Sequence, residues 1–198
     1  MEETREQILA VGAGRGWDLH ELERQGLLRL DFVPPVEIAA DALLHKAKEA
    51  VKSFQATRVV VDSLSSLDLS LSSRGRFPEL AYALAKSFRA QGVTTVLTNA
   101  SAELMGSTVI SGRGIGSAAD NIILLRYVEV EARLARAIVV LKVRGSAYEH
   151  VLRELVITDD KLTVREAFRE YRGVLTGLAT PAGDMPRRRR GRDNGEGS

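Results

Sequence analysis

The chain has 198 residues, of which 44% are hydrophobic, and this is enough for one well-buried domain. It contains no cysteine, which excludes disulfide bonds and thiolate metal sites and is typical of a reducing compartment, so we expect it in the cytoplasm. The first residues are charged and no apolar stretch approaches about 18 residues, a pattern that predicts neither a signal peptide nor a membrane span.

The first 54 residues contain three helix patterns and one strand pattern. Asp18 is a typical N-cap, with Glu21 at the capping-box position three residues later. Gly26 is placed to end the helix that Asp18 begins. The expected elements are a helix over Thr4–Ala13, a short helix from Asp18 to Gly26, an alternating strand over Leu27–Phe32 and an amphipathic helix over Glu37–Phe54.

A strand, a helix and a second strand follow. Arg58–Asp62 is a short apolar run, typical of a strand that is covered on both faces. Pro78–Gln91 is predicted to be a helix that Gly92 ends, and Val93–Asn99 a second short buried strand. This order predicts parallel strands joined by a crossover helix, and hence an α/β fold with a mostly parallel sheet flanked by helices.

The second half changes to strands with short connections, which predicts antiparallel pairing toward the carboxyl-terminal side of the sheet. The predicted strands are Asn121–Val130, Arg136–Ser146 and Val151–Thr158, followed by a short helix over Arg165–Arg172. We expect one domain over residues 1–177 and a disordered, arginine-rich tail over residues 178–198, where Gly, Pro and Arg are frequent.

The net charge of +2 originates in that tail. From Asp184 onward it holds five of the 28 basic and three of the 26 acidic residues, which leaves 23 of each in the rest of the chain. The body is therefore neutral. The arginine run is either a solvated tail or a segment that docks on phosphates.

Both apolar strands in the middle of the chain end in polar residues. Asp62 and Ser63 close the first strand, and Thr98 and Asn99 close the second. Ligands of open α/β sheets bind beyond the carboxyl ends of the strands, and an aspartate in this place commonly holds Mg²⁺ on a nucleotide. The alternative is that Asp62 only caps the following turn, and its position alone leaves both readings open.

Two other patterns relate to phosphate binding. The phosphate-loop sequence G-x-x-x-x-G-K-[ST] is absent, because no Gly-Lys pair occurs in the chain. Lys142 and Arg144 lie two apart on a predicted strand and so share one face, and Gly145 next to them allows a close backbone approach, which would suit a terminal phosphate. Spacing alone favours the alternative of two solvent-facing cations that protect an edge strand.

Several segments of the chain are informative when they are taken together. They are MEETREQ and GRGWDLHELERQGLL near the beginning, then RVVVDSLSSL, TNASAELMG, DNIILLRYVEV, RAIVVLKVRGSAYE and RELVITDD. In this order and spacing they resemble the KaiC family, and the resemblance extends to about Gly177. The resemblance implies a RecA-type ATPase that binds ATP with Mg²⁺ between neighbouring subunits, usually of a hexameric ring. Members that act in circadian clocks also phosphorylate their own chain.

The resemblance also implies roles for single residues. Glu2 and Glu3 match adjacent glutamates, one of which activates the attacking group, and Glu2 is in addition a candidate Mg²⁺ ligand. Asp62 matches the aspartate of the Walker B motif. Ser117 matches one of two adjacent phosphate acceptors. The segment that reaches a neighbouring subunit's nucleotide is matched by Arg136, Lys142, Val143 and Arg144, with Gly145 and Ser146 following.

The sequence departs from the family at its start, because the strand and the phosphate loop that precede the glutamate pair are missing. We therefore expect the carboxyl-terminal part of one KaiC-type domain, which hydrolyses ATP poorly by itself because the phosphates lack their amide cradle and lysine. Two other classes stay open. One is a non-catalytic interaction subunit of a KaiC-like ring, with partner proteins, and the other is a nucleic-acid-binding module that uses its sheet and arginine tail.

Overall fold

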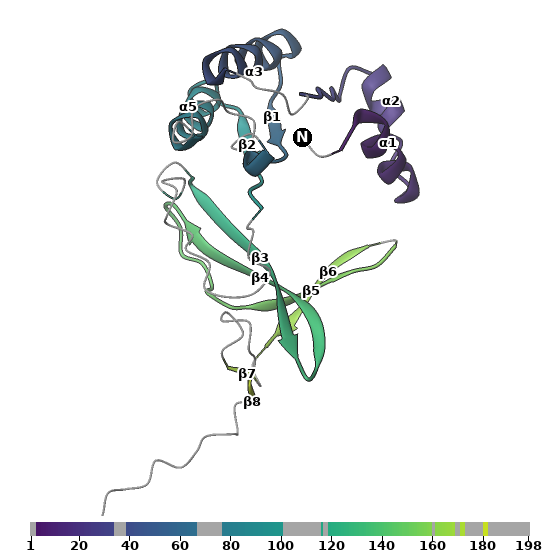
Figure 1. The fold of residues 1–198 in the computed structure, drawn as a ribbon, viewed down its shortest axis with the longest axis vertical. Helices are drawn as coiled ribbons and strands as arrows, with labels where there is room; N and C mark the ends of the chain where they lie inside the picture. Colours follow the sequence, from purple (N-terminus) through teal and green to yellow (C-terminus); the bar gives the residue numbers. More distant parts are fainter. Residues whose placement is uncertain are drawn as a thin grey trace, which may run out of the picture.

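The structure of the protein is a computed structural model that describes residues 3–33, 39–66, 77–100, 116, 119–159, 161–168, 171–172 and 180–181. The described strands form three separate sheets, and α3 and α5 lie beside the first of them (Figure 1). The helices are α1 (Arg5–Gly14), α2 (Leu19–Arg24), α3 (Ala40–Phe54) and α5 (Phe77–Ala90). The strands are β1 (Arg58–Val61), β2 (Thr94–Leu97), β3 (Asn121–Val130), β4 (Arg133–Val143), β5 (Arg153–Ile157), β6 (Leu162–Ala167), β7 (Tyr171–Arg172) and β8 (Thr180–Pro181).

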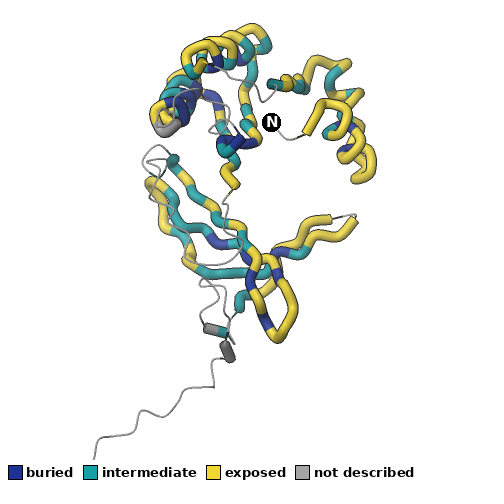
Figure 2. The backbone as a smooth tube through the Cα atoms, in the orientation of Figure 1, coloured by how far each residue is buried: buried dark blue, intermediate teal, exposed yellow. Residues whose placement is uncertain are grey.

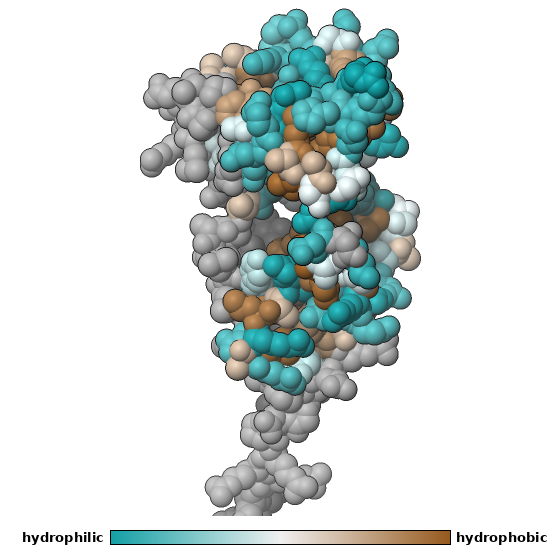
Figure 3. Space-filling model, turned by 90° about the vertical axis from the view of Figure 1, so that its right-hand side faces the viewer, coloured by the Kyte–Doolittle hydropathy of each residue, from teal (hydrophilic) through white to brown (hydrophobic). Residues whose placement is uncertain are grey.

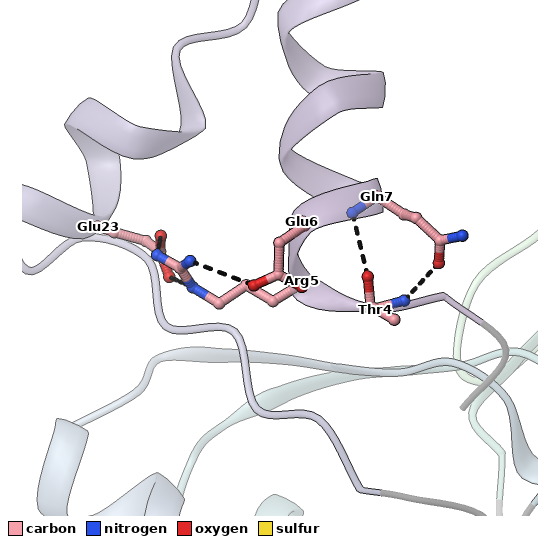
Figure 4. A network of polar contacts seen from close by, with 5 residues as sticks. All are labelled: Thr4, Arg5, Glu6, Gln7 and Glu23. Atoms are coloured by element: carbon pink, nitrogen blue, oxygen red, sulfur yellow. Dashed lines mark hydrogen bonds and ion pairs between the residues drawn. The ribbon is translucent and has the colours of Figure 1, made fainter.

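Helices α1 and α2 pack on each other at the amino-terminal side of the fold. Thr4 caps α1 in a capping box, in which its hydroxyl accepts a hydrogen bond from Gln7 N and the Gln7 side chain accepts one from Thr4 N (Figure 4). Arg5 Nη2 lies 2.5 Å from Glu23 Oε2 and so joins the two helices. Hydrogen bonding to the backbone, and then to the Thr4 hydroxyl, lowers the pKa of Glu6.

The predicted N-cap of α2 is confirmed, since Asp18 Oδ1 accepts a hydrogen bond from Glu21 N at 2.9 Å. Substitution Asp18→Ala is expected to lower the free energy of unfolding by about 1 kcal/mol, because it leaves an amide of the first turn without its acceptor. Denaturant unfolding measures this loss. Asp18→Asn keeps the acceptor and should change the free energy by only a few tenths of a kcal/mol; an equal loss in both variants would contradict the capping explanation.

The parallel pairing predicted for the middle of the chain is confirmed. Strands β1 and β2 pair in parallel and α5 lies between them in the chain. Helices α3 and α5 pack on each other and on one face of this sheet, where the half-buried Val59 and Val61 pack against the core. Buried stretches of the backbone gather where α3 and α5 face the sheet (Figure 2). The largest almost fully buried side chains of this core are Leu64, Leu84 and Phe88, with exposed fractions of 1%, 2% and 0%.

The opposite face of β1–β2 corrects the prediction that these strands are covered on both faces. Val60 and Val96 are cross-strand partners, and they are 67% and 52% exposed. The reason is that both described helices which pack on this sheet cover the same face. The space-filling view also shows hydrophobic side chains at the surface in the helical part and in the antiparallel part of the molecule (Figure 3).

Strands β3, β4, β5 and β6 form an antiparallel sheet in that order. The antiparallel pairing predicted for β3, β4 and β5 is confirmed, whereas β6 was not predicted as a strand. Glu131 and Ala132 close the long β3–β4 hairpin with φ of 51° and 57°, which is the backbone that a two-residue hairpin turn requires. Leu141 lies at a register shift opposite Ile122 and Ile123. One face buries Val128, Val130, Ala135 and Ala137, and the other exposes Ile123, Leu125 and Tyr127.

Two sequence-based predictions of elements are wrong. Leu27–Phe32 forms no strand, because its alternating pattern finds no strand partner among the described residues; Leu27 and Phe32 are 67% and 40% exposed. Arg165–Arg172 is not a helix, since Arg165–Ala167 completes β6 against β5 and Tyr171–Arg172 pairs with β8. The pairing with β8 includes Thr180–Pro181 of the predicted tail, and residues 182–198 lie outside the described part. Among the described helices, none is both long and apolar enough to cross a bilayer.

Candidate functional site

The carboxyl ends of β1 and β2 bring the predicted polar residues together. Thr98 Oγ1 donates a hydrogen bond to Asp62 Oδ1 at 2.5 Å, and Thr98 N donates to Val61 O at 3.1 Å. Leu64 N donates to Thr98 O at 2.8 Å, so the chain after β1 is joined to the end of β2 on both sides of Asp62. The peptide bond between Asp62 and Ser63 is cis. Asp62 itself is exposed.

Three serine hydroxyls that follow Asp62 in the chain are joined by hydrogen bonds. Ser63 Oγ lies 2.8 Å from Ser65 Oγ and 2.9 Å from Ser66 Oγ, and Ser65 Oγ accepts a hydrogen bond from Ala100 N at 3.2 Å. Ser63 Oγ also accepts a hydrogen bond from Ser66 N at 3.3 Å. The cap of the turn after β1 is therefore the Ser63 hydroxyl, and the Asp62 carboxylate points instead to the Thr98 hydroxyl.

This donor set fits a magnesium ion that is shared with a nucleotide. Mg²⁺ prefers oxygen ligands and is usually held by one or two carboxylates together with phosphates and water. Asp62 offers one exposed carboxylate beside the Thr98 hydroxyl. In the described part of the chain no group of three or more His, Cys, Asp or Glu forms a protein-only metal site. Asp62 could therefore contribute to a nucleotide-bound Mg²⁺, directly or through water.

A second group of functional candidates lies at the end of β4. The half-buried Lys142 donates from Nζ to Gly116 O and to Ala119 O, both at 2.8 Å. Arg144 Nε lies 3.2 Å from Asp120 Oδ1, and Arg144 N donates to Asp120 O at 2.9 Å. Lys142 and Arg144 thus contact three described residues that precede β3, namely Gly116, Ala119 and Asp120.

Sequence reasoning missed two members of this group. Asp120 Oδ1 contacts Arg89 Nη1 at 2.9 Å in addition to Arg144 Nε. Arg89 belongs to the last turn of α5, 31 positions away in the chain. The one available signal was a carboxylate that stands directly before the apolar strand β3. We call Arg89, Asp120, Lys142 and Arg144 the cation cluster.

The remaining candidates of this segment are placed as follows. Arg136 stands over the Tyr127 ring, with 5.5 Å from its guanidinium carbon to the ring centroid, on the face of the sheet that is exposed. Val143 is half-buried and pairs with Asn121. Gly145 has φ of +84°, a conformation that L side chains rarely adopt, and Ser146 is exposed. None of these observations assigns a ligand to the segment.

Three other candidates are not brought to either group by a described contact. Glu2 and Ser117 lie outside the described residues, although Lys142 bonds the carbonyl groups of Gly116 and Ala119 on either side of the Ser117–Ala118 pair. Glu3 is exposed and directly precedes Thr4, the N-cap of α1.

The two groups are tied to opposite ends of β2. Asp62 bonds Thr98, which follows the carboxyl end of β2, whereas Asp120 bonds Arg89, which precedes its amino end. Four residues of β2 span about 13 Å. Asp62 and the cation cluster therefore lie toward opposite ends of β2. No hydrogen bond or ion pair among the described residues joins them.

Comparison with known proteins identifies the family. The family model described as "ATPase: KaiC" matches residues 1–168. The chain belongs to the KaiC ATPase family. A circadian clock oscillator protein KaiC of Thermostichus vulcanus is 34% identical over 179 residues, which are 90% of this chain and 34% of that protein. The KaiC of Synechococcus elongatus is 32% identical over the same length, again 90% and 34% of the two chains.

The KaiC family assignment also confirms the fold. A crystal structure of a KaiC-like protein from the archaeon Pyrococcus horikoshii OT3 superposes with a TM-score of 0.69 at 26% identity. The match covers 83% of this chain and 72% of that one. The α/β fold of RecA type, with a parallel and an antiparallel part, is therefore as predicted. The chain spans about a third of the length of the curated KaiC relatives, with 34% of each covered.

Proposed function

We propose that the chain is an ATPase module of KaiC type that acts in an oligomer, as a ring in the cytoplasm, with ATP bound where two subunits meet. In this proposal Arg144, Lys142 and Arg136 reach the phosphates of a nucleotide held by a neighbouring subunit. Asp62 contributes to the Mg²⁺ of a nucleotide on its own subunit. The observation that supports this most is the separation of Asp62 from the cation cluster across β2.

The chemistry of the two places agrees with phosphoryl transfer to water. Catalysis of this reaction depends on positioning and on neutralising the charge that spreads over the transferred phosphoryl group. Lys142 and Arg144 supply two cations two positions apart, held by contacts to Gly116, Ala119 and Asp120. Mg²⁺, when bound, neutralises charge on the phosphate oxygens, and Asp62 would hold it. Glu2 or Glu3 would activate the attacking water, as the family resemblance implies.

The phosphate cradle must come from another segment or subunit, because the sequence contains no G-x-x-x-x-G-K-[ST]. Backbone amides and a lysine of such a loop hold the β- and γ-phosphates, and no described element of this chain replaces them. We therefore expect the chain alone to bind Mg·ATP weakly and to hydrolyse it at a rate close to the uncatalysed one. With a KaiC-type subunit that carries the loop, hydrolysis is expected.

The experiment compares ATP hydrolysis by the chain alone, by the loop-bearing subunit alone and by their mixture, each with Mg²⁺. A rate of the mixture above the sum of its parts supports the proposal. Rapid hydrolysis by the chain alone would contradict the proposal, because other residues of this chain would then have to hold the phosphates of ATP. Autophosphorylation at Ser117 is read from the same samples by mass spectrometry.

Substitution Asp62→Asn is expected to raise the Mg²⁺ concentration needed for half-maximal hydrolysis by the mixture about tenfold, because it removes a charged ligand but keeps the shape of the side chain. The matched control is Asp31→Asn, because Asp31 is an exposed carboxylate paired with Arg29. This variant should leave the Mg²⁺ concentration for half-maximal hydrolysis unchanged. An Asp62→Asn variant with an unchanged Mg²⁺ requirement would contradict the metal role.

A second candidate function is a non-catalytic interaction subunit that keeps only the surfaces of a KaiC-type ring. Exposed apolar side chains on two sheets favour it, namely Val60 and Val96 on one and Ile123, Leu125 and Tyr127 on the other. Exposed apolar surface of this kind marks contact sites of proteins. The two functions differ in the mixture, where an interaction subunit would assemble without raising the hydrolysis rate and without any effect of Arg144→Ala.

A further inference from the structure

Asp120 makes three contacts that converge on Arg144 and α5. Its main-chain carbonyl accepts from Arg144 N at 2.9 Å, and its carboxylate oxygen Oδ1 lies 3.2 Å from Arg144 Nε. The same oxygen lies 2.9 Å from Arg89 Nη1. The first contact fixes the backbone of Arg144 and the second fixes its side chain. The third ties both to the last turn of α5.

Stability is a poor explanation for these ion pairs. The side chains of Asp120, Arg89 and Arg144 are 40%, 60% and 48% exposed. Ion pairs at such exposure contribute little to the free energy of folding, because water screens them. What the contacts do supply is orientation. A guanidinium is a rigid planar fork with five N–H donors, so a carboxylate that holds Nε sets the direction of the terminal nitrogens, which are suited to a phosphate.

The same segment also holds the second cation. Lys142 Nζ donates to the carbonyl groups of Gly116 and Ala119, which both precede Asp120 in the chain. The segment therefore orients one cation through a carboxylate and the other through neutral carbonyl groups. With three cationic side chains and one carboxylate, the cation cluster keeps an excess of two positive charges to attract a triphosphate.

We infer that Asp120 is a positioning residue of the ATPase site, which orients the Arg144 guanidinium for the phosphates of a neighbouring subunit's nucleotide. This inference rests on the proposed function, in which Arg144 reaches that nucleotide. Asp120 acts through Arg144 and does not touch the phosphates. Arg89 connects the Asp120 carboxylate to α5 and so contributes to the orientation of Arg144 only indirectly.

The kinetic test uses Asp120→Asn in the mixture with a loop-bearing subunit. Asparagine keeps a neutral acceptor but loses the negative charge, which weakens the contact with Arg144 Nε and loosens the Arg144 side chain; a misplaced catalytic group costs on the order of tenfold to a hundredfold in kcat. The KM for ATP should not rise, because the variant makes the cluster more cationic. Asp120→Glu restores a carboxylate and should recover part of kcat. Arg89→Ala leaves the Asp120–Arg144 contact in place and should change kcat less than about threefold.

A second measurement uses the isolated full chain and needs no hydrolysis. In ¹⁵N–¹H spectra the Nε–Hε signal of Arg144 is expected to be sharp and slowly exchanging in the unaltered chain and in Arg89→Ala. In Asp120→Asn the same signal should be broadened by side-chain motion, and its Hε proton should exchange quickly with water. Backbone spectra of all variants check that they fold. An Arg144 signal that is equally mobile with and without the carboxylate would overturn the inference.

The two proposals fail in different ways. If Arg144→Ala abolishes hydrolysis by the mixture while Asp120→Asn leaves kcat unchanged, Asp120 does not position Arg144 and the proposed function stands. If Arg144→Ala has no effect, the proposed function falls, and the inference falls with it. A rise in KM with unchanged kcat in Asp120→Asn would also overturn the inference, since it would assign Asp120 to binding.

Discussion

Substitution Arg144→Ala is expected to lower the rate of ATP hydrolysis by the mixture about a thousandfold, and Lys142→Ala is expected to lower it by a similar factor. Cations that reach the transferred phosphoryl group from a neighbouring subunit typically contribute on the order of 10³ to 10⁵ in kcat. The loss should lie in kcat, because the charge that these side chains neutralise is greatest in the transition state. Steady-state kinetics with Mg·ATP measures it.

The matched control for Arg144→Ala is Arg165→Ala. The Arg165 side chain on β6 is 61% exposed and pairs with Glu154 at 3.7 Å, so this variant removes the same side chain at a place without a proposed phosphate contact. Its rate should equal that of the unaltered chain. A comparable loss in both variants would show that positive charge in general, and not Arg144 in particular, drives the reaction.

The largest expected effect on stability comes from Phe88→Ala. The Phe88 side chain is fully buried between α3, α5 and the β1–β2 sheet, where it belongs to the same core as Leu64 and Leu84. Its truncation is expected to lower the free energy of unfolding by about 3–5 kcal/mol, because apolar burial is lost and a cavity remains. Denaturant unfolding followed by circular dichroism gives the value.

Tyr82→Ala on the same helix is the control for Phe88→Ala. Tyr82 is 48% exposed, so its truncation removes an aromatic ring without opening a core cavity and should cost less than about 1 kcal/mol. If the two variants unfold at the same denaturant concentration, the α3–α5 core does not carry the stability of this part of the chain.

Much of the fold could be predicted because its patterns are local. The amphipathic period of α3 and α5, the N-cap at Asp18 and the apolar run of β3 each act within one element. The predictions that were wrong concern which elements pair or pack with one another. Leu27–Phe32 alternates like a strand but finds no strand to pair with among the described residues. Val60 is exposed between two half-buried neighbours, because the described helices cover one face of the sheet only. A pattern within one segment cannot show what lies beside it.

The candidate site could be predicted in part for the same reason. Asp62 and Thr98 stood out because parallel strands place their carboxyl ends at one edge, and the structure brings them within hydrogen-bonding distance. The contacts of Lys142 and Arg144 with Gly116, Ala119 and Asp120 depend on the pairing of β3 with β4, which spacing along one strand does not specify. The Arg89–Asp120 contact joins a helix end to a strand start and leaves no periodic signal in the sequence.

The most direct test of the central claim is complementation. A KaiC-type subunit that keeps its phosphate loop but has its own matching lysine and arginine replaced by alanine is mixed with this chain, and ATP hydrolysis is measured. We predict that the chain restores hydrolysis and that its Arg144→Ala variant does not. No restoration, or equal restoration by both, would contradict the claim that this chain supplies cations to a neighbour's nucleotide.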